Sequence, residues 1–131
     1  MSGRENEAKS RLLSLAPQFL TQDLESATSF YTDQLGFREL FQFEGFYAAV
    51  ARDGVVLHLK HSDEPDPGHA FKRQHEHLDV YITTEDVDGI CREFQERGVA
   101  LTQPIHDTAW GTREFVVEDR DGYLLYFGQP K

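Results

Sequence analysis

Short stretches of alternating apolar and polar residues run through the chain, bounded by glycine, proline or aspartate. Such alternation is typical of strands with one buried face. In the segment Val55–His61, for example, Val55, Leu57 and Leu59 point to one side and the residues between them point to the other. The strands expected on this basis are Arg38–Glu44, Phe46–Arg52, Val55–His61, Leu101–His106, Thr112–Glu118 and Tyr123–Phe127.

A repeated pattern precedes each group of three strands. Residues Leu15–Phe37 and His77–Val99 each read as a strand, an aspartate that begins a helix, and a glycine that ends it. Asp23 is positioned to cap the first helix, and Gly36 and Gly98 follow the last helical residues. The apolar residues recur at helical spacing: Leu24, Ala27, Phe30, Tyr31 and Leu35 in the first helix, and Val87, Ile90, Cys91 and Phe94 in the second.

The repeat predicts one domain of the α+β class, built from two paired βαβββ modules. A chain of 131 residues with 39% hydrophobic content is long enough for one core and short for two domains. We divide it into a flexible N-terminus at 1–12, a first module at 13–61, a linker at 62–76 and a second module at 77–128. The linker is rich in Pro, Gly, Asp and His, which are typical of loops.

Composition limits the partners and the compartment. The chain has 23 acidic and 13 basic residues, and the formal net charge of -10 disfavours binding to nucleic acid and anionic membranes. No apolar run approaches the length of a membrane span. Cys91 is the only cysteine, and its place among the apolar residues of the second helix predicts a buried thiol without a disulfide. These features predict a soluble cytoplasmic protein.

One face of the expected sheets carries polar and aromatic side chains. It includes His58, Asp79, Tyr81 and Tyr126, which alternate with apolar neighbours. Pocket walls are mostly apolar or aromatic, with a few placed polar groups. We therefore expect this face to line a binding site.

Two strings of residues resemble the vicinal-oxygen-chelate superfamily, which includes glyoxalase and bleomycin-resistance proteins. The string DLESATSFYTDQLGF at 23–37 is similar to the first helix of these proteins, and WGTREFVVEDRDG at 110–122 is similar to their closing hairpin. The match runs from Leu15 to Gly128, and the second string resembles the bleomycin-resistance branch in particular. The resemblance implies curved mixed sheets with the helices on their outer face.

Enzymes of this superfamily hold a divalent metal on four strands, and the resemblance places the corresponding positions at Ala16, His58, Asp79 and Tyr126. Alanine has no ligating atom, and a neutral tyrosine is a poor ligand. We therefore predict no metal, no cofactor and no catalytic residue. The alternative is a metal-dependent lyase or dioxygenase of the glyoxalase type, with a non-standard ligand set that uses His58, Asp79 and a further ligand. His58 and Asp79 are otherwise a candidate hydrogen-bonded pair.

The bleomycin-resistance proteins that the sequence resembles are homodimers, and they trap a cationic glycopeptide unaltered in two clefts between the subunits. The expected ligand-binding set joins the aromatic residues that match those clefts, one acidic residue and the polar face described above: Phe41, Phe46, Tyr81, Trp110, Glu114, His58, Asp79 and Tyr126.

This resemblance predicts a homodimer that sequesters a small aromatic or cationic antibiotic, of the bleomycin type or another, without turnover. A regulatory module that binds a ligand is a third possibility. For Trp110 two placements stay open, an exposed ring at a strand entry and a core filler under the closing hairpin. Glu114 has two readings as well, because Arg113 is a candidate partner for it.

Overall fold

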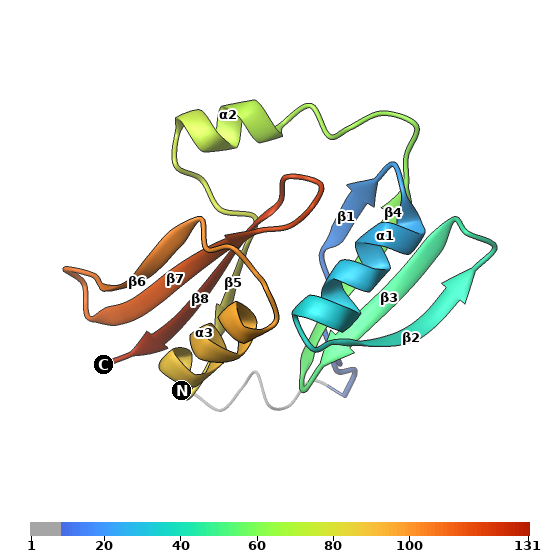
Figure 1. Ribbon diagram of the computed structural model, residues 1–131. Coiled ribbons are helices and arrows are strands. Elements are labelled where there is room, and N and C mark those ends of the chain that lie inside the picture. Colours follow the sequence, from blue (N-terminus) through green and yellow to red (C-terminus); the bar gives the residue numbers. More distant parts are fainter. Residues whose placement is uncertain (1–8) are drawn as a thin grey trace.

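The computed structural model describes residues 9–131, and it contains two four-stranded sheets, each with a helix on one side (Figure 1). Most of the predicted flexible segment 1–12 therefore lies outside the described residues. The first module comprises β1 (Gln18–Thr21), α1 (Leu24–Ser29), a π-helical turn η2 (Phe30–Gln34), β2 (Arg38–Phe43), β3 (Tyr47–Arg52) and β4 (Val55–His61). After α2 (His69–Gln74), the second module comprises β5 (Val80–Thr83), α3 (Val87–Glu96), β6 (Gln103–Asp107), β7 (Thr112–Glu118) and β8 (Leu124–Pro130).

Both sheets have the same topology. The strand orders are β1-β4-β3-β2 and β5-β8-β7-β6. In each sheet the first strand pairs in parallel with the last, and the other neighbours are antiparallel. The predicted α+β class with two βαβββ modules is confirmed. β4 and β7 have the predicted bounds, whereas β8 continues past Phe127 to Pro130.

Aspartate caps begin both module helices, in agreement with the repeat. Asp23 accepts a hydrogen bond from the backbone N–H of Ser26 at 3.1 Å, and Asp86 accepts one from Gly89 at 3.0 Å. These bonds satisfy N–H groups that have no partner inside the helix. The helical segments end before glycines of positive φ, 75° at Gly36 and 88° at Gly98, and glycine adopts this conformation without steric cost.

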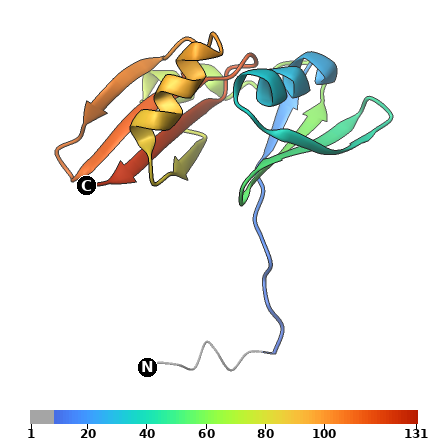
Figure 2. The same ribbon diagram turned by 60° about the horizontal axis from the view of Figure 1, so that its bottom comes forward.

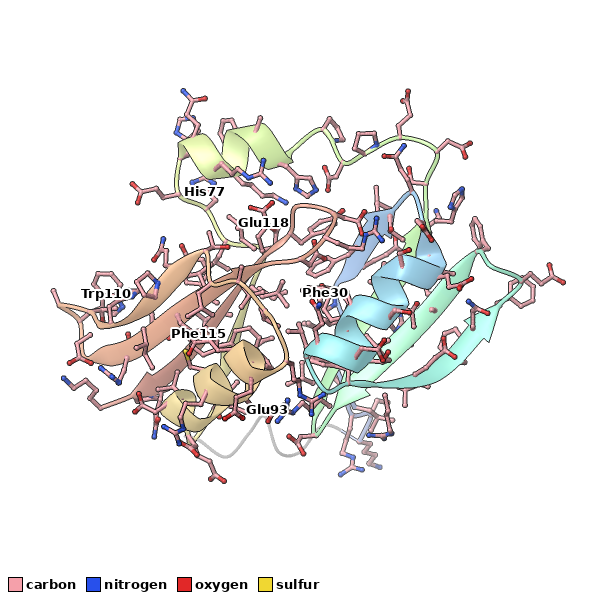
Figure 3. The ribbon with its side chains drawn as sticks, in the orientation of Figure 1. Phe30, His77, Glu93, Trp110, Phe115 and Glu118 are labelled. Carbon is pink, nitrogen blue, oxygen red and sulfur yellow. The ribbon has the colours of Figure 1, made fainter. Side chains whose placement is uncertain are left out.

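The two modules share one hydrophobic core. Leu57 and Leu59 of β4 belong to it and are almost fully buried, which confirms the inner face assigned from alternation. In the second module Phe115 of β7 packs against Phe94 of α3, with 5.9 Å between ring centroids (Figure 3). Cys91 of α3 is also buried, as expected. Each fully buried side chain of this size contributes roughly 1.5–3 kcal/mol, so the core is the main stabilising element.

The β7–β8 turn joins the second module to the first. The ring of Tyr123 stacks on Phe19 of β1 with 4.1 Å between centroids, and its hydroxyl accepts a hydrogen bond from the N–H of Leu20 at 2.8 Å. Tyr31 of η2, fully buried, donates to the carboxylate of Asp119 at 2.7 Å. The other Asp119 oxygen accepts two backbone N–H groups of its own turn. One carboxylate therefore holds both the turn and the neighbouring module.

An ion pair links the modules at a second point. Arg52 of β3 donates to the two oxygens of Glu93 on α3 at 2.8 and 2.9 Å, and also to the backbone carbonyl of Leu35 at 2.8 Å. Figure 3 shows Glu93 on the part of α3 near the first module. Paired N–H donors on a carboxylate restrict its geometry as well as its distance. The two modules thus have direct contacts within one chain.

The segment expected to be a linker contains the helix α2, which runs above the ends of the strands in Figure 1. Lys72 forms an ion pair with Asp79 at the start of β5, and Arg73 pairs with Glu118 of β7 at 2.6 Å. None of the residues of α2 is buried. A helix without a buried face needs no periodic apolar residues, so the sequence pattern did not predict it.

The described N-terminal segment extends away from the body of the chain before β1 (Figure 2). Its leucines are almost completely accessible, with exposed fractions of 101% at Leu12 and 85% at both Leu13 and Leu15. Within residues 9–131, no helix has the length and apolar character needed to cross a membrane.

Asp119→Asn tests the buried carboxylate between the modules. Burial raises the pKa of Asp119 from 3.8 to about 6, even though hydrogen bonds from Tyr123 and Tyr31 oppose the shift. A carboxyl group with a raised folded-state pKa stabilises the fold when protonated, and this contribution is lost as the pH rises through about 6. We expect the wild type to lose stability between about pH 4 and about pH 7, because Asp119 ionises, whereas the Asn side chain does not titrate. The free energy of unfolding of the variant minus that of the wild type should therefore be larger at about pH 7 than at about pH 4. Urea titration at the two pH values measures this difference.

Glu64→Gln is the control for this experiment, because Glu64 is exposed on the surface. Its free energy of unfolding should follow that of the wild type at both pH values. If the difference in free energy of unfolding between Asp119→Asn and wild type did not change with pH, the role given to the buried carboxylate would be contradicted.

Candidate functional site

Each sheet has one side turned toward its helix and one turned away. We call face A the side of the first sheet opposite α1, and face B the side of the second sheet opposite α3. In Figure 1, α1 and α3 lie on the viewer's side of the sheets, so both faces are turned to the rear. Alternation and register place these side chains on the two faces: Gln18, Phe41, Tyr47 and His58 on face A, and Tyr81, Glu114 and Tyr126 on face B.

Three side chains of face A form a hydrogen-bonded chain across β1, β4 and β3. Gln18 donates from Nε2 to the hydroxyl of Tyr47 at 2.9 Å, and the same hydroxyl lies 2.9 Å from Nδ1 of His58. The ring of Phe41 is parallel to Tyr47 at 6.3 Å and edge-on to His58 at 6.4 Å. Ala49 lies between Phe41 and His58 in the register, and its small side chain leaves room for these rings.

Further aromatic side chains extend face A toward the β2–β3 turn. The rings of Phe41, Phe43 and Phe46 are 48%, 58% and 47% exposed. A cluster of large exposed apolar side chains marks an interaction surface more often than an isolated one does. The ammonium group of Lys60 lies 5.7 Å from the centroid of Phe46 and makes a cation–π contact with it.

A buried carboxylate lies at the centre of face B. Glu114 is only 4% exposed, and its Oε2 accepts hydrogen bonds from the hydroxyls of Tyr81 at 2.6 Å and Thr112 at 2.8 Å. Burial and the contact with Glu114 raise the pKa of Tyr81, so this phenol keeps its proton and continues to donate. Because burying a carboxylate is costly without partners, these two hydroxyls keep Glu114 in one position.

Tyr81 reaches Glu114 by crossing β8 at Gly128. In the register Tyr81 lies opposite Tyr126, whereas Gly128 lies opposite Glu114. A methyl group at position 128 would overlap the hydroxyl of Tyr81, so the close approach requires glycine. Tyr126 adds a second ring to face B, 6.5 Å from that of Tyr81.

The environments of Trp110 and Arg113 decide two alternatives that the sequence left open. Trp110 is 75% exposed and lies near the tip of the β6–β7 hairpin in Figure 3, so it is not a core filler. Arg113 forms ion pairs with Asp88 and Asp107 at 3.0 and 3.1 Å and does not pair with Glu114. The partners of Glu114 are therefore Tyr81 and Thr112, and Trp110 lies on the surface.

Asp79 is bound into the scaffold. One of its oxygens pairs with Lys72 of α2, and the other accepts the backbone N–H of Leu124 at 2.7 Å. His58 lies in the other sheet and is bound to Tyr47, so the suggested hydrogen bond between His58 and Asp79 is not formed. These bonds fix the beginnings of β5 and β8. The two strands carry the tyrosines of face B, Tyr81 and Tyr126.

The register corrects two of the four positions assigned to the metal ligands of the superfamily. Gln18, and not Ala16, lies opposite His58, and Ala16 precedes β1 altogether. In the second sheet Tyr81, and not Asp79, lies opposite Tyr126 of β8. Sequence reading missed Gln18 for this reason. It also missed Tyr47, although the dense aromatic segment around residues 41–47 was a signal for it.

The two positions in the second sheet, Tyr81 and Tyr126, are poor ligands for a divalent metal, because a neutral phenol binds metal weakly. The Tyr81 phenol donates to Glu114, and both Gln18 and His58 are hydrogen-bonded to Tyr47. Metal ligands must instead present free lone pairs toward one point. Over residues 9–131, no group of three or more His, Cys, Asp or Glu side chains is arranged to hold a metal ion.

A cavity of about 320 Å³ lies elsewhere, between the β3–β4 turn and α3. It contains none of the predicted ligand-binding residues. Its walls are mainly apolar and come from both modules, and they include Phe37, Val55, Ile82, Ile90, Phe94 and Phe127.

Comparison with known proteins gives the family. Residues 13–127 match the model of the glyoxalase/bleomycin resistance protein/dioxygenase superfamily. The chain belongs to this superfamily. An uncharacterised protein of Mycolicibacterium smegmatis (strain ATCC 700084 / mc(2)155) is 32% identical over 111 residues, which cover 84% of this chain and 87% of that protein.

Several solved structures share the fold. The bleomycin resistance determinant encoded on the transposon Tn5 has a TM-score of 0.75 at 20% identity, covering 92% of this chain and 99% of that one. The bleomycin-binding protein of Streptomyces verticillus, in complex with copper(II)-bleomycin, has a TM-score of 0.71 at 24% identity and covers 93% and 99%. TioX from Micromonospora sp. ML1 has a TM-score of 0.73 at 22% identity and covers 91% and 99%.

Gly128→Ala tests how this superfamily member positions Tyr81. The added methyl group should displace the Tyr81 hydroxyl from Glu114, so the pKa of Tyr81 should return toward 10.0. The free energy of unfolding should fall by about 1–3 kcal/mol because of the overlap. Ultraviolet titration of the phenols, with Tyr81→Phe variants as references, measures the first effect, and urea titration measures the second.

Gly54→Ala is the matched control, because a side chain at position 54 would enter open space. It should leave the titration of Tyr81 unchanged. The same unchanged titration in Gly128→Ala would show that Tyr81 does not need this glycine to reach Glu114.

Proposed function

We propose that this protein binds and sequesters a flat aromatic compound that carries positive charge, without chemical turnover. The ligand lies between face A of one chain and face B of a second copy, so a homodimer has two equivalent sites. A bleomycin-type antibiotic is the first candidate ligand.

The observation that carries this proposal is the uncovered aromatic surface of face A. Phe41, Phe43 and Phe46 are each about half exposed, and they adjoin the fixed polar group His58. Each pair of stacked or edge-to-face rings contributes about 0.5–1.5 kcal/mol beyond the apolar area that it buries. A planar ligand on this surface would gain both the ring–ring attraction and the burial of apolar area.

Face B supports a preference for positive charge. The carboxylate of Glu114 accepts a hydrogen bond from Tyr81, and the ring of Tyr81 lies 6.5 Å from that of Tyr126. A cation near such rings gains both ion pairing and cation–π attraction. The net charge of -10 adds long-range attraction for cationic ligands.

Two surfaces support the dimer. Each chain offers only half of the proposed site, and a two-fold axis would bring face A against face B of the partner twice. The leucines at positions 12, 13 and 15 are also exposed in the single chain. Apolar side chains at this density are typical of the interior of an interface.

The comparisons support the ligand class through the shared fold. Among the structural relatives, one is described as a bleomycin-binding protein in complex with copper(II)-bleomycin, and another as a bleomycin resistance determinant. Because unrelated activities occur on one fold, the residues of faces A and B carry the argument for this chain.

Titration with bleomycin, metal-free and copper-loaded, tests the proposal through the fluorescence of Trp110 and through calorimetry. We expect saturable binding of one ligand per chain, with the ligand recovered unchanged by mass spectrometry. Phe41→Ala and Glu114→Gln should each weaken binding by about tenfold or more, as residues at the centre of an interface do.

Phe71→Ala is the matched control, because Phe71 is 57% exposed on α2 and belongs to neither face. It should bind like the wild type. Chemical conversion of the ligand, or near-stoichiometric divalent metal that is lost in His58→Ala, would contradict sequestration and favour a metal-dependent enzyme.

Sedimentation equilibrium tests the dimer. The wild type should sediment as a dimer at micromolar concentration, and replacement of Leu12, Leu13 and Leu15 together by serine should raise the dimer dissociation constant by about a hundredfold, because three apolar side chains lose their burial. Phe71→Ser removes an exposed apolar side chain elsewhere and should not change the dissociation constant. A stable wild-type monomer would remove the shared site.

A further inference from the structure

A chain of hydrogen bonds on face A bears on which nitrogen of His58 carries the proton. Gln18 of β1, Tyr47 of β3 and His58 of β4 are connected through the single hydroxyl of Tyr47. The amide nitrogen of Gln18 acts only as a donor, so it occupies a lone pair of that hydroxyl. With the one phenolic proton directed to Nδ1 of His58, which lies 2.9 Å away, the three groups form a chain that runs in one direction.

A neutral imidazole that accepts at Nδ1 carries its proton at Nε2. No hydrogen-bond partner for Nε2 is found among residues 9–131, and this atom is not sealed from solvent, unlike both ring nitrogens of His69. In this arrangement of the protons, His58 presents an N–H donor on face A.

The surroundings of this donor are aromatic. The ring of Tyr47 meets His58 at 79° with 5.5 Å between centroids, and that of Phe41 meets it at 77° with 6.4 Å. A bound ring would exclude water from this position. An N–H donor that loses its water without gaining an acceptor costs free energy, so the site discriminates against ligands that lack an acceptor.

We infer that His58 is a specificity-determining hydrogen-bond donor that selects flat ligands with an unprotonated ring nitrogen or a carbonyl oxygen at one edge. This inference rests on the proposed binding function and makes it more specific. The acceptor edge of the ligand faces His58 on face A, and the cationic end faces Glu114 on face B. Heteroaromatic amines of this polarity are bound more tightly than hydrocarbon amines of the same size.

Imidazole ¹⁵N NMR of the full chain at about pH 8, where an ordinary imidazole is neutral, tests the tautomer without any ligand. We expect the His58 signals, assigned with His58→Gln, to show a proton on Nε2 and none on Nδ1. Tyr47→Phe should convert this pattern into a mixture of tautomers. A proton on Nδ1 in the wild type, with Gln18 accepting from Tyr47, would overturn the inference.

Two flat primary amines test the selectivity. 6-(Aminomethyl)quinoxaline and 2-(aminomethyl)naphthalene have the same size and charge and differ only in the two ring nitrogens. The wild type should bind the quinoxaline about tenfold more tightly, as one hydrogen bond in a dry site allows. The ratio should fall to about one in His58→Phe and persist in His58→Gln, which keeps a donor.

His75→Phe, on the exposed end of α2, is the control and should keep the wild-type ratio. Equal affinity of the wild type for the two amines, or equal ratios in His58→Phe and His58→Gln, would overturn the role of His58 while leaving sequestration intact. Failure of both amines and of bleomycin to bind would instead overturn the proposed function, and the inference with it.

Discussion

The packing of the β7–β8 turn against β1 and η2 is the contact on which the rest of the structure depends. Each module covers only one side of its sheet with a helix, so neither module completes a core by itself. Phe19 and Tyr123 close the shared core, and the hydrogen bond from Tyr31 to Asp119 ties the turn to the opposite module. A buried carboxylate with three donors is costly to disturb. The two sheets are therefore held in one relation to each other.

This arrangement leaves faces A and B uncovered within the chain and keeps their polar groups in place, as the proposed ligand site requires. On face A the hydroxyl of Tyr47 positions His58, and on face B the hydroxyls of Tyr81 and Thr112 position Glu114. Groups that are already ordered lose little entropy when they bind a ligand. The helix α2 contributes at a distance, because Lys72 holds Asp79 at the start of the strand that carries Tyr81.

The superfamily fold alone does not decide between binding and catalysis, because one fold serves many chemistries. The proposal of binding rests on the side chains in the strand positions. Here the row across β1 and β4 holds Gln18 and His58, and the row across β5 and β8 holds two tyrosines. Gln18 and His58 both bond to Tyr47, and Tyr81 bonds to Glu114, so these three side chains are held in place by neighbouring groups.

The sequence by itself determined the class of fold, the strand faces and the helix caps, because these follow from local periodicity and from residues such as Asp23 and Gly36 that act within one turn of the chain. Only the tertiary structure decided which side chains meet. The register between strands moved two expected positions from Ala16 and Asp79 to Gln18 and Tyr81, since a strand pairs with its neighbour by backbone hydrogen bonds that a single sequence does not reveal. The partners of Glu114 and the exposure of Trp110 likewise arise from contacts between elements, and no local pattern records them.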